Sequence, residues 1–112
     1  MRRSCLATAL AAALFAAPGI AAPPDAAKIY AKTCALCHGE AGQPNETFAK
    51  IGVRSFKDQE WRKATTDAQI DKSIRDGKKG TLMASFERQL SAEEIRALVA
   101  YVRKLGGAAQ KK

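Results

Sequence analysis

The chain has 112 residues, a formal net charge of +8, three cysteines, one histidine and an apolar fraction of 46%. These numbers allow one small domain and exclude a disulfide-rich scaffold and a disordered chain. The positive charge favours acidic partners but is too small to indicate a protein that binds nucleic acid. Because aromatic residues make up only 6% of the chain, we expect a cofactor or a crosslink to complete the core.

Residues 1–22 have the features of a secretory signal peptide. Arg2 and Arg3 provide a positive start, residues 5–17 are apolar and rich in alanine, and small residues follow up to the expected cleavage site. The apolar run is too short to cross a bilayer comfortably. We therefore expect an exported bacterial protein of the periplasm, whose mature domain spans residues 23–112 without a stable membrane span.

Four helical segments are predicted in the mature chain, and no stretch alternates with the period of a strand. The first begins at Asp25, an N-cap candidate behind two prolines, and runs into a cysteine motif. A short second helix covers residues 58–63. The third opens on the capping-box pair Thr66 and Gln69 and ends at Gly77.

The last predicted helix has the clearest pattern. Ser91 and Glu94 form a second capping box, and a pair of glycines ends the helix. Its apolar residues recur at helical spacing and form one stripe of Ile95, Leu98, Val99, Val102 and Leu105. The connections 39–55 and 78–90 are longer than simple links require. The sequence therefore predicts a small all-α domain with two long loops.

Cys34-Ala35-Leu36-Cys37-His38 is a C-x-x-C-H motif, which indicates covalent haem attachment. Two thiols one helical turn apart can bond to the two vinyl groups on one edge of a haem, and His38 then lies under the iron as proximal ligand. A thioredoxin-like redox pair would need a βαβ context, and a structural zinc site would need four Cys or His ligands. The mature chain has no strand pattern and only three such residues.

The second axial ligand follows by elimination. His38 is the only histidine, so two histidines of one chain cannot ligate the iron. Met83 is the only methionine of the mature chain and lies 45 residues after His38, in the predicted loop 78–90. Met83 is therefore the candidate sixth ligand. The alternative is an ordinary core methionine.

Together these residues resemble the class I c-type cytochromes, a family of small monohaem electron-transfer proteins. The correspondence covers nearly all of the mature sequence. Besides the haem motif, it includes residues of the first and last helices and the glycine-rich stretch before the methionine: Ala26, Tyr30, Leu98, Tyr101 and residues 77–86. The resemblance implies a cytochrome c fold around one covalently attached haem c. It also implies that Cys34 and Cys37 anchor the haem, that His38 and Met83 ligate its iron, and that no residue is catalytic.

Two positions depart from the pattern of the family. Ala84 stands where the family commonly has a proline directly after the methionine, so the loop is expected to be less rigid and the iron–sulfur bond weaker or exchangeable. The family also often has a proline whose carbonyl accepts the N–H of the proximal histidine, and the corresponding stretch 49–52 has none. Another backbone carbonyl can orient His38, because this hydrogen bond needs only an oxygen.

A haem would supply the apolar bulk that the core lacks. The residues expected around it are Ile51, Phe56, Trp61, Ile70, Ile74, Leu82, Phe86, Leu98 and Val102. Burial of the iron and thioether ligation both raise the reduction potential. Two roles stay open for Trp61: its indole N–H donates to a haem propionate, or its ring is half-buried under the second loop.

Basic residues gather in the two segments expected to border the haem. They are Lys72, Arg75, Lys78 and Lys79 in one segment and Lys50, Arg54 and Lys57 in the other. Together they predict electrostatic steering of a redox partner with an acidic docking surface, and a solvated surface without such a role is the alternative.

The sequence thus predicts an exported, monomeric electron carrier that shuttles single electrons between periplasmic or membrane redox enzymes and is not itself an enzyme. Two other functions stay open. With a labile Met83 beside Ala84, the protein would be a haem ligand-binding protein or a weak peroxidase. With an exposed apolar patch, it would be a dedicated electron-accepting subunit of a dehydrogenase or reductase complex.

Overall fold

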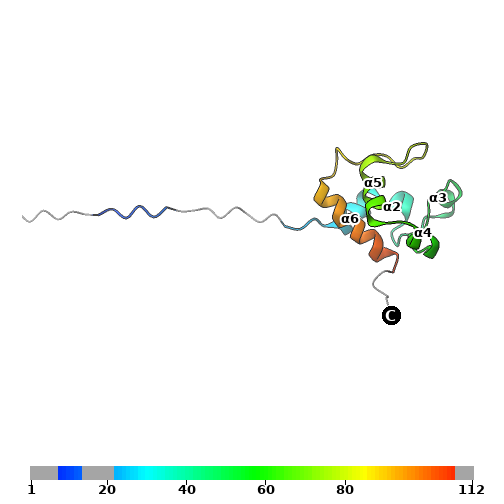
Figure 1. Cartoon of the computed structure of the whole chain (residues 1–112), viewed down its shortest axis with the longest axis horizontal. Helices are drawn as coiled ribbons and strands as arrows, with labels where there is room; N and C mark the ends of the chain where they lie inside the picture. The colour runs from blue at the N-terminus through cyan, green and yellow to red at the C-terminus, as the bar shows by residue number, and fades with distance from the viewer. Residues whose placement is uncertain (1–7, 14–21, 108–112) are drawn as a thin grey trace, which may run out of the picture.

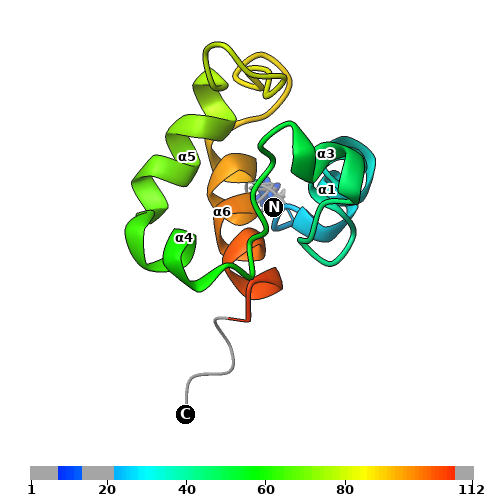
Figure 2. The ribbon, with the colours of Figure 1, turned by 90° about the vertical axis from the view of Figure 1, so that its right-hand side faces the viewer.

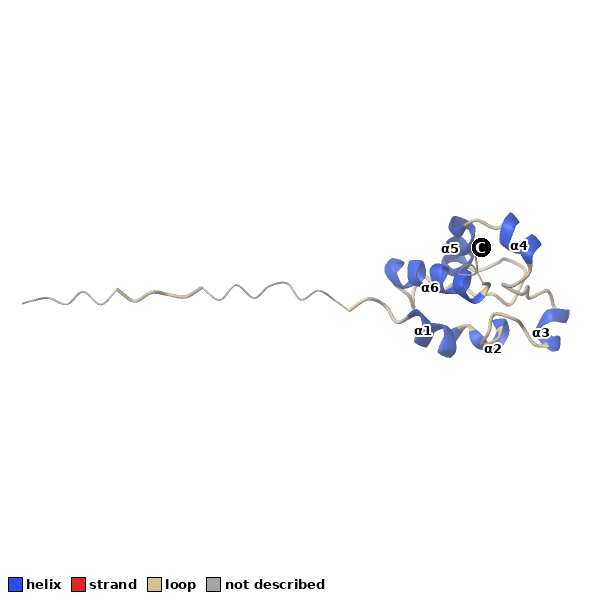
Figure 3. Cartoon of the chain, turned by 90° about the horizontal axis from the view of Figure 1, so that it is seen from below, coloured by secondary structure: helices blue, strands red, loops and turns tan. Residues whose placement is uncertain are grey.

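The computed structural model describes residues 8–13 and 22–107, in which there are six helices and no strand (Figure 3). The predicted all-α class is confirmed for this part of the chain. Most of the predicted signal peptide and the C-terminal end after Gly107 lie outside the described residues. None of the described helices combines the length and the hydropathy that a membrane span requires.

The helices agree with the predicted segments apart from two differences. Their bounds are α1 Ala26–Thr33, α2 Ala35–His38, α3 Glu46–Lys50, α4 Gln59–Ala64, α5 Asp67–Asp76 and α6 Ala92–Leu105. The predicted first helix is divided at Cys34, which ends α1 and precedes α2. The predicted loop 39–55 contains the short helix α3, which starts because the Asn45 side chain accepts a hydrogen bond from the Phe48 N–H at 3.0 Å.

The predicted helix starts are confirmed by their capping contacts. The Asp25 side chain accepts from the Lys28 N–H at 3.1 Å and begins α1. Thr66 with Gln69 and Ser91 with Glu94 form reciprocal capping boxes at α5 and α6, each through two hydrogen bonds. Each such cap stabilises a helix by about 1 kcal/mol, so local chemistry determines where these helices begin.

Helix α6 forms the centre of the core, with α1 and α5 packed against it (Figures 1 and 2). Tyr30 of α1 meets Tyr101 of α6 with ring centroids 5.2 Å apart. Four residues of the predicted stripe are buried and Leu105 is half-buried. The other buried apolar residues are Phe56, Ile70 and Ile74. The stripe of α6 therefore packs against both α1 and α5.

Candidate functional site

Helices and both long loops surround a cavity of about 1130 Å³. Small-molecule and cofactor sites commonly have volumes of ~300–1000 Å³, so this cavity can hold a large ligand. Its wall contains all nine residues that the sequence predicts around the haem: Ile51, Phe56, Trp61, Ile70, Ile74, Leu82, Phe86, Leu98 and Val102. Ile51 and Leu82 are 58% and 75% exposed, which places them at its rim.

The cysteine motif forms a single helical turn in the cavity wall. The backbone N–H groups of Cys37 and His38 both donate to the carbonyl of Cys34, at 3.3 and 3.0 Å. Cys34 and Cys37 are free thiols that are half-buried and line the cavity. Burial raises the pKa of the Cys34 thiol to about 11. The turn therefore places both thiols at the same cavity.

The His38 imidazole lies against the ring of Phe56. The two rings are stacked, with centroids 4.9 Å apart and planes at 19°. Burial lowers the pKa of His38, which favours the neutral imidazole that coordinates metals. Its Nδ1 is buried and has no hydrogen-bond partner among the described residues. Stacking on Phe56 therefore orients this ring, and no backbone carbonyl of the described residues accepts a hydrogen bond from its Nδ1. The sequence predicted Phe56 only as one of the residues around the haem.

Tyr30 connects α1 to the turn that follows His38. Its side chain is buried, and its hydroxyl donates to the carbonyl of Gly39 at 2.7 Å. Gly39 has a φ of 78°, and a Cβ at this position would lie 1.8 Å from the Gln43 carbonyl oxygen, so the turn requires glycine. Tyr30 therefore fixes the end of the cysteine motif. The sequence indicated Tyr30 only as a packing residue, although the polar tip of a buried tyrosine usually finds a partner.

Replacing Tyr30 with phenylalanine should destabilise the folded holoprotein by about 1–2 kcal/mol, because the Gly39 carbonyl loses its donor while the ring is retained. Denaturant titration measures this loss. Tyr101→Phe is the matched control, since Tyr101 contacts the Tyr30 ring but its hydroxyl makes no hydrogen bond within residues 22–107. Equal losses in the two variants would contradict the role of the hydrogen bond.

Met83 reaches the same cavity from the loop between α5 and α6. It is half-buried and lines the cavity together with Cys34, Cys37 and His38. The structure therefore gathers around one space all four residues that the sequence singled out. Two thiols, an imidazole and a thioether on an apolar wall form the donor set of a covalently attached haem with His/Met ligation. The residues present thus fit this cofactor.

Trp61 of α4 is half-buried and forms part of the cavity wall. The Arg103 guanidinium carbon lies 6.0 Å from the centroid of its ring. Arg103 donates to the carbonyl oxygens of Arg62 and Thr65, and Arg62 donates in return to the Arg103 carbonyl at 3.3 Å. These contacts hold α4 against the end of α6 and keep the indole at the cavity. No acceptor contacts the indole N–H in the described part of the chain.

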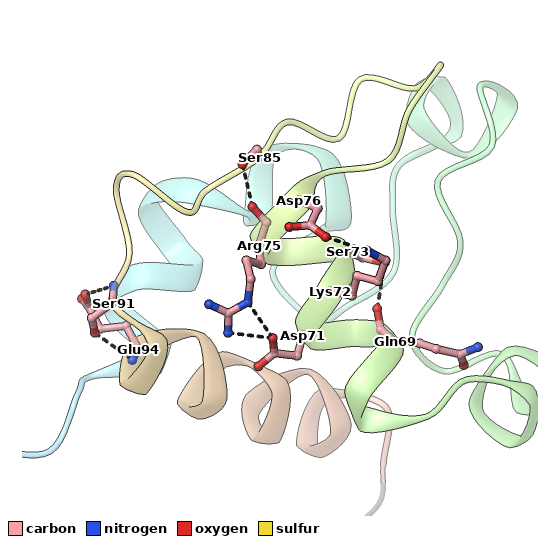
Figure 4. A network of polar contacts seen from close by, with 9 residues as sticks. All are labelled: Gln69, Asp71, Lys72, Ser73, Arg75, Asp76, Ser85, Ser91 and Glu94. Carbon is pink, nitrogen blue, oxygen red and sulfur yellow. Dashed lines mark hydrogen bonds and ion pairs between the residues drawn. The ribbon is translucent and has the colours of Figure 1, made fainter.

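The basic residues near the cavity differ in their pairing. Four of them form ion pairs of 2.7 to 2.9 Å with carboxylates four residues away: Lys50 with Glu46, Arg54 with Asp58, Lys72 with Asp76 and Arg75 with Asp71. Figure 4 shows the last two pairs. Lys78 and Lys79 line the cavity and have no ion pair among the described residues. The unpaired positive charge at the cavity therefore lies on the loop of Met83.

The sequence matches, over residues 21–102, the family described as cytochrome C oxidase, cbb3-type, subunit III. It is similar to the cbb3-type cytochrome c oxidase subunit FixP of Azorhizobium caulinodans, with 38% identity over 93 residues, which cover 82% of this chain and 30% of that protein. FixP of Bradyrhizobium diazoefficiens is 33% identical over 80 residues, which cover 71% of this chain and 26% of that protein. The chain thus spans less than a third of the length of these relatives.

A solved structure of similar fold is the KustC0563 c-type cytochrome. It has 36% sequence identity and a TM-score of 0.68, and the match covers 73% of this chain and 98% of that one. The structure of a mutant of the same protein gives 35% identity and a TM-score of 0.66 over 73% of this chain and 99% of that one. Unlike the curated relatives, this cytochrome is matched almost end to end.

Proposed function

Because the chain belongs to the family described as cytochrome C oxidase, cbb3-type, subunit III, we propose that it is a monohaem cytochrome that carries single electrons between redox proteins. The predicted cytochrome c fold and the covalently bound haem c are confirmed by this family and by the similar c-type cytochrome structure. An electron-transfer role follows from the same relatives in general terms. Export to the periplasm and a freely diffusing monomer without catalytic residues belong to the proposal.

In this proposal Cys34 and Cys37 form the thioether links, and His38 and Met83 ligate the iron. The observation that carries it is the gathering of these four side chains at one apolar cavity. The haem supplies the one-electron redox centre when bound. Phe56 stacks on His38 and orients it, and His38 and Met83 would ligate the iron when the haem is bound. With both residues as ligands, the iron would have no open position for a substrate.

An optical spectrum of the mature holoprotein tests this proposal. We expect a low-spin haem in both oxidation states, a near-infrared sulfur-to-iron band in the oxidised state and a reversible one-electron titration. A high-spin ferric spectrum would instead support the haem ligand-binding or peroxidase function. The absence of covalently bound haem would overturn the proposal entirely.

A second candidate is a dedicated electron-accepting subunit of a larger redox complex. The curated relatives are themselves named as subunits of an oxidase, and this chain matches less than a third of their length. Size-exclusion chromatography of the protein purified from its native membranes and periplasm distinguishes the two. Elution as a free monomer supports the diffusing carrier, and stable co-elution with a membrane enzyme supports the subunit.

We expect Lys78→Gln/Lys79→Gln to slow electron exchange with an acidic redox partner by roughly tenfold at low salt, because steering depends on the charge around the docking site. Stopped-flow rates measured over a range of ionic strength test this. The matched control is Lys63→Gln/Lys104→Gln, which removes the same charge from residues that do not line the cavity. Rates that do not depend on salt would contradict electrostatic steering.

A further inference from the structure

The loop that carries Met83 runs from the end of α5 to the start of α6 and contains no helix or strand. Because Ala84 follows Met83, the sequence predicts a less rigid loop. The structure shows a set of hydrogen bonds to the backbone on both sides of Met83. The Met83 carbonyl accepts from the Lys78 N–H at 2.9 Å, which closes residues 78–83 into a turn.

The Thr81 hydroxyl lies at the centre of this turn. It donates to the Lys78 carbonyl at 2.7 Å and accepts from the Met83 N–H at 3.1 Å. The Thr81 N–H also donates to the Lys78 carbonyl, at 3.1 Å. Both backbone polar groups of Met83 therefore have partners within the turn, and one of the two depends on a side-chain hydroxyl. Such side-chain bonds to nearby backbone set local conformation in place of regular secondary structure.

The turn is anchored to the end of α5 by contacts on its C-terminal side. The Ser85 hydroxyl donates to the Arg75 carbonyl at 2.6 Å (Figure 4), and the Phe86 N–H donates to the Ile74 carbonyl at 3.0 Å. At Gly77 a Cβ would lie 2.7 Å from the Met83 carbonyl oxygen. Only glycine therefore lets the Met83 segment lie so close to the end of the helix.

We propose that Thr81 is a positioning residue for Met83 and that its hydroxyl keeps the thioether at the haem iron. This inference rests on the proposed function, in which Met83 is an axial ligand. Loss of the hydroxyl frees the Met83 N–H and raises the fraction of molecules in which the thioether has left the iron. An external ligand binds only to that fraction, so its apparent affinity reports the fraction directly. Thr81 thereby favours electron transfer over ligand binding.

The test compares holoproteins of the wild type, Thr81→Val and Thr81→Ser. Valine removes the hydroxyl at nearly constant shape, and serine restores it. We expect Thr81→Val to bind cyanide threefold to tenfold more tightly than the wild type and to lose part of the near-infrared sulfur-to-iron band, whereas Thr81→Ser should behave as the wild type. Ser85→Ala should shift both properties in the same direction as Thr81→Val. Thr47→Val is the control, because Thr47 is exposed on α3 and does not line the cavity.

Three outcomes are decisive. Tighter cyanide binding in Thr81→Val with rescue by serine supports the inference. Unchanged cyanide affinity in Thr81→Val, in a protein whose wild type shows the sulfur-to-iron band, overturns it whatever Ser85→Ala does, and leaves the proposed function intact. A wild type without that band overturns both the positioning role and the proposed ligation by Met83.

Discussion

Replacing Cys34 and Cys37 together with alanine is expected to abolish covalent haem attachment and to cost the chain its native tertiary structure. Several residues that pack α1, α5 and α6 together, among them Tyr30, Leu98 and Val102, also line the cavity of about 1130 Å³. Without the haem this apolar wall would face water, and burial of apolar surface is the main contribution to the ~5–15 kcal/mol that stabilises a small domain. Haem staining after denaturing electrophoresis measures the first effect, and near-ultraviolet circular dichroism measures the loss of tertiary structure.

Leu36→Ala provides the matched control for the cysteine variant. Leu36 lies between the two cysteines in the same helical turn, but its side chain is 80% exposed and does not line the cavity. This variant should keep its haem and its near-ultraviolet signal. Covalent haem in the double cysteine variant would contradict the assignment of Cys34 and Cys37, and loss of haem in Leu36→Ala would show that the turn tolerates no change.

Replacing Met83 with alanine should remove the near-infrared sulfur-to-iron band and convert the ferric haem to high spin. Alanine leaves one axial position without a protein ligand, because the chain has no second histidine. Thioether ligation raises the reduction potential, so we expect the midpoint potential to fall by roughly 0.2 V, within the ~0.8 V range that axial ligands span. Spectroelectrochemical titration measures this shift, and carbon monoxide should now bind to the reduced protein.

Leu82→Ala separates the loss of the ligand from disturbance of its loop. Leu82 precedes Met83 and lies at the rim of the cavity with 75% of its side chain exposed, so its truncation should change the band and the potential much less than Met83→Ala does. A Met83→Ala protein that keeps a low-spin spectrum and the same potential would show that another group ligates the iron. In that case Met83 would line the same cavity as Cys34, Cys37 and His38 without ligating the iron.

The positions of the helices could be predicted well because their signals are local. Thr66 with Gln69 and Ser91 with Glu94 lie three residues apart, and their capping bonds form wherever the backbone enters a helix. Two features of the helices were not predicted, helix α3 and the break at Cys34, because neither has a strong local signal. Helix α3 has five residues, too few to show apolar periodicity, and only Asn45 signals its start. The C-x-x-C-H spacing is the same whether or not the helix is interrupted at Cys34, so the sequence does not indicate this break.

The site could be predicted in its donor residues but not in the contacts that arrange them. The cysteine spacing and the single methionine of the predicted mature chain point to the donors by residue identity alone. The stacking of Phe56 on His38, the hydrogen bond from Tyr30 to Gly39 and the turn around Thr81 are set by how the loops cross the cavity.

By itself, the sequence determined the helix starts, the buried stripe of α6 and which side chains we propose to bind the haem. Each of these depends on residue type or on contacts within one or two helical turns. Only the tertiary structure decided which side chains orient His38 and Trp61 and which lysines at the cavity remain unpaired. The contacts of Arg62 and Arg103, for example, join residues 41 positions apart. Such contacts form only after the core has closed, because the long loops can take many paths until burial selects one.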